Sequence, residues 1–198
     1  MHKKNLLSVV ILLILCIHCT TKKDEKESKT LFNLVDNNKT NIHFKNTVKE
    51  NLYFNFLNFA YIYNGGGVAV GDINNDGLED IYFTGNLVDN KLYLNKGNWQ
   101  FEDITEKAGL GCPNVWSTGA TFVDINGDGY LDLYVCKSGK QEGPNRHNEL
   151  FINNGPSNGQ ENISFTESAK DYGLDVEGLS VHSAFFDYDK DGDLDAYV

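Results

Sequence analysis

Long hydrophobic runs and cysteines are both scarce in this sequence, and each scarcity excludes a class of protein. The longest apolar stretch covers twelve residues, from Leu6 to Ile17, whereas a membrane-spanning helix needs about 20. Four cysteines in 198 residues are too few for a small domain stabilised by disulfides. In the hairpin register that we expect, Cys136 lies opposite about residue 120 and away from Cys112. We therefore predict two free, partly buried thiols.

Basic residues are also few. The chain has 17 Lys and Arg against 28 Asp and Glu, a net charge of −11, whereas nucleic-acid-binding proteins carry basic surfaces. We therefore expect no nucleic-acid partner. The sequence also lacks the Gly-x-Ser-x-Gly, phosphate-loop, dinucleotide-binding and His-Glu-x-x-His motifs. We predict no catalytic residues in this chain and no enzyme activity.

What the sequence does contain is one acidic nine-residue loop in three copies: loop 1 (72–80), loop 2 (124–132) and loop 3 (187–195). Positions 1, 3, 5 and 9 carry side-chain oxygens, and position 6 is glycine, which tolerates the positive φ of a sharp turn. With the carbonyl of position 7, the predicted ligands are Asp72, Asn74, Asp76, Leu78 and Asp80; Asp124, Asn126, Asp128, Tyr130 and Asp132; and Asp187, Asp189, Asp191, Asp193 and Asp195. Oxygen ligands without Cys or His favour Ca²⁺ over zinc or copper. The sequence thus predicts one Ca²⁺ per loop, three in all.

The flanks of these loops distinguish them from EF-hands. An EF-hand requires a bidentate Glu at position 12, where this sequence has Phe83, Val135 and Val198. Short β-branched and aromatic runs precede and follow loops 1 and 2, a pattern typical of strands. Each loop is therefore predicted to be the turn of a β-hairpin.

The negative charge is concentrated in the loops. They hold twelve carboxylates and one cation, Lys190, which together account for −11. Such charges repel one another in the metal-free protein, and three Ca²⁺ ions would neutralise six of them. We expect metal binding to be linked to folding, with the ions acting as structural staples rather than as sensors.

The repeat extends beyond the loops. Segments 90–97 and 148–155 match as a third strand, and 101–110 and 165–174 match as a fourth. Four short antiparallel strands are the content of one β-propeller blade. The sequence therefore predicts an all-β fold of about two and a half blades, an incomplete propeller. Since a propeller closes with about four to eight blades, we expect a fragment of a longer protein or a truncated gene product.

The segments NGGGVAVGD (64–72), NKLYLNKG (90–97) and FEDITEKAG (101–109) resemble the FG-GAP/VCBS repeat family, which also builds the propellers of integrin alpha chains. They are especially similar to surface lipoproteins of Bacteroidetes-type bacteria, which often end in an ASPIC/UnbV-type domain. The resemblance covers about residues 40 to 198. It implies Ca²⁺ at loop positions 1, 3, 5, 7 and 9.

The N-terminus has the features of a bacterial export signal. A basic start precedes the apolar run, and Cys19 follows it, an order typical of lipoproteins that are cleaved before the Cys and acylated on it. His18 is larger than the small residue usual at that place, so acylation of Cys16, plain secretion and a retained anchor remain open. Residues 22–29 carry seven charges in eight positions, which predicts a solvated tether. We expect a lipid-anchored location at the outer membrane or cell surface of a bacterium.

The predicted organisation has six parts. They are a signal peptide (1–18), a charged tether (19–30), an N-terminal strand or latch segment (31–63), a first blade (64–111), a second blade (112–175) and a truncated third blade (176–198). Tyr53 to Tyr63 is aromatic and partly alternating, so a strand leading into the first blade is expected there. Trp116 and Tyr172 fall where blades need large rings, and we expect both in the core rather than in a sugar-binding platform.

These features predict a calcium-binding module that recognises or adheres to a protein or a polysaccharide through loops on one face of rigid blades. One alternative is a propeller enzyme that acts on polysaccharide, with its active site in blades outside this chain. The other is a scaffold within an outer-membrane uptake complex.

Overall fold

The computed structural model of the protein describes residues 30–138, 146–156 and 163–198. It divides into two units, Met1–Leu34 and Val35–Val198. The first unit is described only from residue 30 to 34, where no helix or strand forms. The predicted signal peptide, both candidate lipidation sites (Cys16 and Cys19) and most of the tether lie outside the described residues. Within those ranges, no helix has both the length and the apolar character that crossing a membrane requires.

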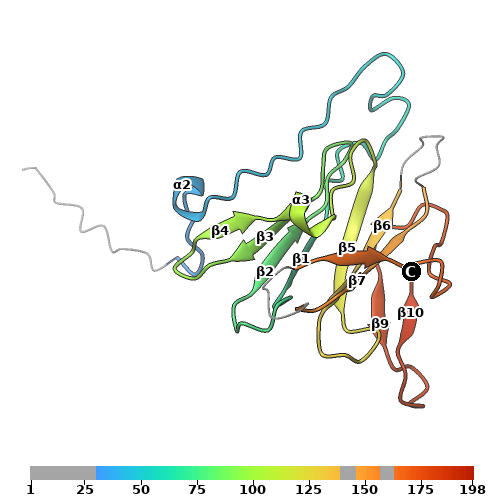
Figure 1. Cartoon of the computed structure of the whole chain (residues 1–198). Coiled ribbons are helices and arrows are strands. Elements are labelled where there is room, and N and C mark those ends of the chain that lie inside the picture. The colour runs from blue at the N-terminus through green and yellow to red at the C-terminus, as the bar shows by residue number, and fades with distance from the viewer. Residues whose placement is uncertain (1–29, 139–145, 157–162) are drawn as a thin grey trace, which may run out of the picture. The chain divides into compact units, whose positions relative to one another are not determined.

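The second unit consists mainly of antiparallel β-strands. Blade 1 contains β1 (Val68–Gly71), β2 (Asp80–Phe83), β3 (Lys91–Asn95) and β4 (Phe101–Asp103); blade 2 contains β5 (Ser117–Val123), β6 (Asp132–Lys137), β7 (Glu149–Asn153) and β8 (Phe165–Glu167); blade 3 contains the hairpin β9 (Ala184–Phe186) and β10 (Asp195–Tyr197). In each sheet the strands are neighbours in chain order, from green in blade 1 to red in blade 3 (Figure 1). The prediction of an all-β fold of incomplete propeller blades is confirmed.

The main core lies between blades 1 and 2. Side chains alternate along β1, so Ala69 is buried whereas Val68 and Val70 on the opposite face are exposed. Ala69 belongs to one apolar cluster with residues of both sheets, including Leu92 of β3 and Leu133 of β6. The two blades are thus held together by the apolar faces that their alternation creates.

A tyrosine and an asparagine form the same buried pair in both blades. The hydroxyl of Tyr82 donates to the carbonyl of Leu110 at 3.1 Å and accepts from Nδ2 of Asn90 at 2.8 Å. The corresponding residues of blade 2 are Tyr134, Leu174 and Asn148, with both distances 2.9 Å. These bonds tie the second strand of each blade to the segment that leads into the next blade.

The fourth strand is shorter than the sequence suggested. β4 ends at Asp103, and a one-turn helix, α3 (Thr105–Ala108), follows it. The Asp103 carboxylate accepts the backbone N–H of Thr105 at 3.0 Å, and Gly109 ends the helix with a φ of +76°. The Asp103–Thr105 hydrogen bond before the helix and the glycine after it replace the continued strand that we expected over 101–110.

The strand expected between Tyr53 and Tyr63 is not formed. Before it, the short helix α2 (Asn37–Thr40) begins a segment that lies along blade 1, where Phe44 stacks on Phe83 with ring centroids 5.2 Å apart. Residues 51–63 form successive turns, because Asn51 Oδ1 accepts the backbone N–H groups of Tyr53 and Phe54 at 2.9 and 2.8 Å. Asparagine side chains that bond the local backbone compete with strand pairing in this way.

The two aromatic residues expected in the core have different environments. Trp116 is 4% exposed and meets the rings of Phe54 and Phe59 edge-on, so its prediction is confirmed. Tyr172 is 44% exposed, and its prediction is wrong. It lies in the turn after β8, where Ala169 is the residue that the core buries.

Candidate metal-binding loops

Each of the three acidic loops closes a β-hairpin. Loop 1 joins β1 to β2, loop 2 joins β5 to β6, and loop 3 joins β9 to β10. The glycines at position 6 have positive φ angles, +85° at Gly77, +87° at Gly129 and +98° at Gly192. The backbone turn that the sequence predicted at position 6 is therefore present in all three copies.

Position 4 also adopts a positive φ, which we did not anticipate. The angles are +59° at Asn75, +71° at Gly127 and +65° at Lys190. Asn and Gly are the residues that enter this region most readily. Asn75 and Gly127 could therefore have predicted the positive φ at position 4 of loops 1 and 2, whereas Lys190 in loop 3 could not.

The position-1 aspartates fold each loop back on itself. The two carboxylate oxygens of Asp72 accept the backbone N–H groups of Asp76 at 3.1 Å and Gly77 at 2.7 Å. Asp124 holds the corresponding groups of loop 2, both at 3.0 Å. In loop 3, Asp187 accepts the N–H of Gly192 at 3.2 Å. These bonds orient position 1 toward the interior of the loop.

The position-5 aspartates are fixed by their neighbours. In loop 1, Asp76 accepts the N–H of Leu78 at 2.8 Å and Nδ2 of Asn74 at 3.0 Å, and loop 2 repeats both bonds. In loop 3 the N–H of Asp193 donates to Asp191 at 3.2 Å. This bond lowers the pKa of Asp191, while the side-chain hydrogen bond with Asp191 and its negative charge raise the pKa of Asp193.

The position-9 aspartates have a structural role that the sequence analysis missed. Asp80 is fully buried, and its two oxygens accept the backbone N–H groups of Ile73 at 3.0 Å and Asn95 at 2.7 Å. The carboxylate thus joins the start of its own loop to the end of β3. Burial raises the pKa of Asp80 to about 6, although both N–H groups oppose the shift.

The same arrangement recurs in loop 2 and in part in loop 3. Asp132, also fully buried, accepts from Ile125 at 3.0 Å and Asn153 at 2.7 Å, and burial raises its pKa. Asp195 accepts from Tyr188 at 2.7 Å. The asparagines that end β3 and β7 occupy the same position in the repeats 90–97 and 148–155, but the sequence analysis assigned them no role.

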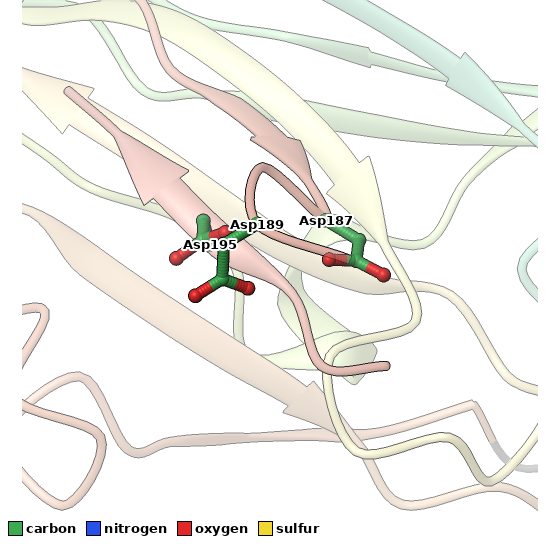
Figure 2. Close-up of side chains that lie close together, drawn as sticks. All are labelled: Asp187, Asp189 and Asp195. Carbon is green, nitrogen blue, oxygen red and sulfur yellow. The ribbon is translucent and has the colours of Figure 1, made fainter. Parts of the chain in front are cut away.

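Three of the predicted ligands meet in loop 3. Carboxylate oxygens of Asp187, Asp189 and Asp195, at positions 1, 3 and 9, lie within 4.8 Å of one another (Figure 2). Among the described residues, no other set of three Asp, Glu, His or Cys side chains approaches so closely. Loops 1 and 2 carry Asn74 and Asn126 at position 3, so the same positions there offer two carboxylates and one amide.

The remaining loop-3 aspartates stand apart from this group. Asp191, whose side chain was predicted to bind the ion, is not a member of the three-carboxylate set. The side chain of Asp193 is not a member either, and only the backbone carbonyl of that residue was predicted as a ligand. Four of the five aspartates of loop 3 are exposed, and the fifth, Asp195, is half-buried. The exposed cluster combines strong mutual repulsion with oxygen ligands, a chemistry that suits a hard divalent cation.

A comparison with known proteins agrees with this geometry. Residues 72–135 match the family model of the FG-GAP-like repeat. The matched FG-GAP-like segment runs from the first residue of loop 1 through loop 2 into β6. It supports an integrin-like β-propeller module for the part of the chain that contains loops 1 and 2, and loop 3 lies outside the matched residues.

One curated relative matches a longer part of the chain. The chain is 35% identical over 91 residues to cartilage acidic protein 1 of Xenopus tropicalis. The aligned region covers 46% of this chain and 13% of the relative. The aligned part of the chain therefore spans about an eighth of that protein's length.

The cysteines are not part of the site. Cys112 and Cys136 are free and buried, so the prediction of unbonded thiols is confirmed, with deeper burial than expected. Burial raises the pKa of Cys136 to about 11 and that of Cys112 still further. Cys112 donates to Glu149 at 3.1 Å, and Glu149 pairs with the buried Lys137 at 2.5 Å. Both thiols are therefore protonated core groups.

A cavity of about 590 Å³ borders two of the loops. Its wall includes Asn74 and Asp76 of loop 1, Tyr130 of loop 2, and the cations Lys96 and Lys107. A volume of this size is in the range of small-ligand sites. An occupant of the cavity would contact both loops directly.

The raised pKa of Asp80 gives a testable pH dependence. A raised pKa means that the folded state binds the proton more tightly than the unfolded state, whose value is about 4. This contribution to stability is complete below pH 4 and is lost as the pH rises through 6. We therefore expect Asp80 to make the metal-free protein less stable at pH 7 than at pH 5 in urea titrations with EDTA.

The control for that experiment is saturating Ca²⁺. A cation beside the carboxylate favours its ionised form, so acidification should then weaken the protein instead. Parallel pH curves with and without Ca²⁺ would contradict the expectation.

Proposed function

We propose that this chain is a calcium-binding, extracellular β-propeller module, anchored to a bacterial surface by a lipid, that recognises a protein or a polysaccharide. The observation that carries the proposal is the meeting of Asp187, Asp189 and Asp195 in a hairpin loop that the chain repeats three times. FG-GAP-like repeats generally bind calcium, which supports extending the assignment to loops 1 and 2.

In each loop, positions 1, 3, 5 and 9 and the carbonyl of position 7 would hold the ion. In loop 1 these groups are the side chains of Asp72, Asn74, Asp76 and Asp80 and the carbonyl of Leu78. A bound cation offsets the repulsion among the carboxylates. The hydrogen bonds of positions 1 and 5 keep those carboxylates oriented in advance, and the position-9 bonds connect the loop to the third strand.

Titration with Ca²⁺ tests the metal assignment. We expect three sites, with dissociation constants of about 10⁻⁴ to 10⁻³ M, as in extracellular modules. Calcium at about ten times the dissociation constant should add about 1.4 kcal/mol of stability per site. Calorimetric titration would measure the first quantity, and thermal unfolding with Ca²⁺ or EDTA would measure the second.

A matched variant makes the titration specific. Asp189→Ala removes one carboxylate of loop 3 that accepts no backbone bond in the hairpin, and it should lower the stoichiometry from three sites to two. A chain that releases no heat with Ca²⁺ and melts at the same temperature in EDTA would end the proposal.

The lipid anchor is supported by the order of basic start, apolar run and Cys at the N-terminus. Acylation at Cys19 would leave the charged segment 22–29 as a spacer between the membrane and the blades. Labelling with a radioactive fatty acid, in the chain and in its Cys19→Ser and Cys16→Ser variants, distinguishes the two candidate positions from plain secretion.

Recognition, rather than catalysis, is favoured by the way in which the acidic residues are used. Asp72, Asp76 and Asp80 are held as hydrogen-bond acceptors of the backbone, so they are not poised for acid-base chemistry. The cavity beside loops 1 and 2 has a volume that suits a small ligand such as a sugar unit. Capture of an outer-membrane transporter by the full-length protein would instead favour the scaffold role.

A further inference from the structure

Loops 1 and 2 are joined directly by a hydrogen bond between neighbouring blades. Nδ2 of Asn75, at position 4 of loop 1, donates to the carbonyl of Gly129, at position 6 of loop 2, over 2.9 Å. The positive φ of Asn75 belongs to the turn that also places Asn74 and Asp76 on either side of it. The bond therefore ends between two of the predicted ligands of loop 1.

The acceptor of this bond belongs to a peptide group that loop 2 itself holds. The carbonyl of Gly129 and the N–H of Tyr130 are the two ends of one peptide group, and that N–H donates to Asp128 at 2.8 Å. Because a peptide group is planar and rigid, its two ends turn together. One rigid group thus connects the position-5 carboxylate of loop 2 to the position-4 side chain of loop 1.

A second bridge runs in parallel through the core. Asn153, 3% exposed, donates from Nδ2 to the carbonyl of Ile73 in loop 1 at 2.8 Å. The backbone N–H of Asn153 donates to Asp132, the position-9 carboxylate of loop 2, at 2.7 Å. Positions 2 and 4 of loop 1 are therefore both tied to predicted ligands of loop 2.

The connection is specific to this pair of loops. Position 4 of loop 2 is Gly127, which has no side chain to reach loop 3. Across residues 30–138, 146–156 and 163–198, no hydrogen bond joins loop 2 to loop 3.

We infer that the calcium sites of loops 1 and 2 are energetically coupled through Asn75, so that occupancy of either site raises the affinity of the other. This inference rests on the proposed calcium binding. Ordering loop 2 fixes the peptide group after Gly129, and the fixed carbonyl then restrains Asn75 and the ligands beside it. Of the two bridges, the buried Asn153 bridge stays closed whether or not the loops are occupied, so we assign the coupling to the exposed Asn75 bond. For one such bond we expect a factor of about five in affinity. Linkage requires the same factor in both directions.

A double-mutant cycle in the full chain tests the coupling. All proteins carry Asp189→Ala, which silences loop 3, and loop 2 is either intact or silenced by Asp124→Ala. Calorimetric titration with Ca²⁺ then gives the affinity of loop 1, with Asn75 present or replaced by Asn75→Gly. Glycine suits the positive φ of that position, as Gly127 shows in loop 2.

We expect silencing of loop 2 to weaken loop 1 about fivefold when Asn75 is present and by less than twofold in Asn75→Gly. The matched control is Asn98→Gly, which makes the same exchange at a φ of +53° in the turn between β3 and β4; it should retain the fivefold effect. Electrostatic effects of Asp124→Ala are common to both backgrounds and cancel in the cycle.

The outcomes separate the two proposals. Equal weakening with and without Asn75 would overturn the coupling while leaving calcium binding intact. Absence of calcium heat in every protein would overturn the proposed function and the coupling with it. If Asp124→Ala fails to fold, the reciprocal variant Asp72→Ala silences loop 1, and the affinity of loop 2 must then fall by the same factor for the inference to survive.

Discussion

Replacement of Asp132 by alanine is expected to lower the free energy of unfolding of the metal-free protein by about 3–5 kcal/mol. Asp132 is fully buried and is the acceptor for the backbone N–H groups of Ile125 and Asn153. Without the carboxylate, the buried N–H of Asn153 and the half-buried N–H of Ile125 are left unpaired, and each bond to a charged acceptor contributes about 1.5–3 kcal/mol. Urea unfolding in EDTA would measure the loss without any contribution from bound metal.

The control for this substitution is Asp128→Ala in the same loop. Asp128 is exposed, so water can replace it as an acceptor for the N–H of Tyr130. We expect a cost of about 1 kcal/mol or less. Similar losses for the two variants would mean that position 9 is only a candidate metal ligand and not a structural acceptor.

A methyl group at Gly119 is expected to separate blade 3 from blade 2. A Cβ there would stand 2.5 Å from the carbonyl oxygen of Val181 and 2.9 Å from Cα of His182. Both neighbours are backbone, which cannot rotate away as a flexible side chain can. Gly67 meets the carbonyl of Thr118 in the same way at the contact between blades 1 and 2. Glycine at positions 67 and 119 therefore lets the backbone of each blade come close to the backbone of the next blade.

For Gly119→Ala we expect a destabilisation of about 1–3 kcal/mol, together with faster amide hydrogen exchange in β9 and β10. Gly178→Ala is the matched control, because a Cβ at Gly178 meets no atom within 4 Å, and it should leave both measurements unchanged. Unaltered exchange in the β9–β10 hairpin of Gly119→Ala would refute this account of blade contact.

The accuracy of the sequence-based predictions depended on how local the determining contacts are. The hairpin turns follow from glycine at position 6 and from the alternation of Val68, Ala69 and Val70, all of which act within a few residues. The segment around Tyr53 was mispredicted because its pattern is also local, yet Asn51 bonds the neighbouring backbone before a strand can pair. The burial of Trp116 was foreseeable from ring size, whereas the exposure of Tyr172 depends on the path of the chain after β8.

The amino-acid sequence by itself determined the repeating unit, the all-β blades and the candidate ligands, since spacing and residue type express these features directly. The tertiary structure decided which of those ligands have a second role. Ile73 and Asn153 are 80 positions apart in the sequence and are joined by a hydrogen bond. Asn75 of blade 1 donates a hydrogen bond to Gly129 of blade 2. Only the packing of one blade on the next brings such pairs together, because the two partners are far apart in the sequence and no local pattern predicts their contact.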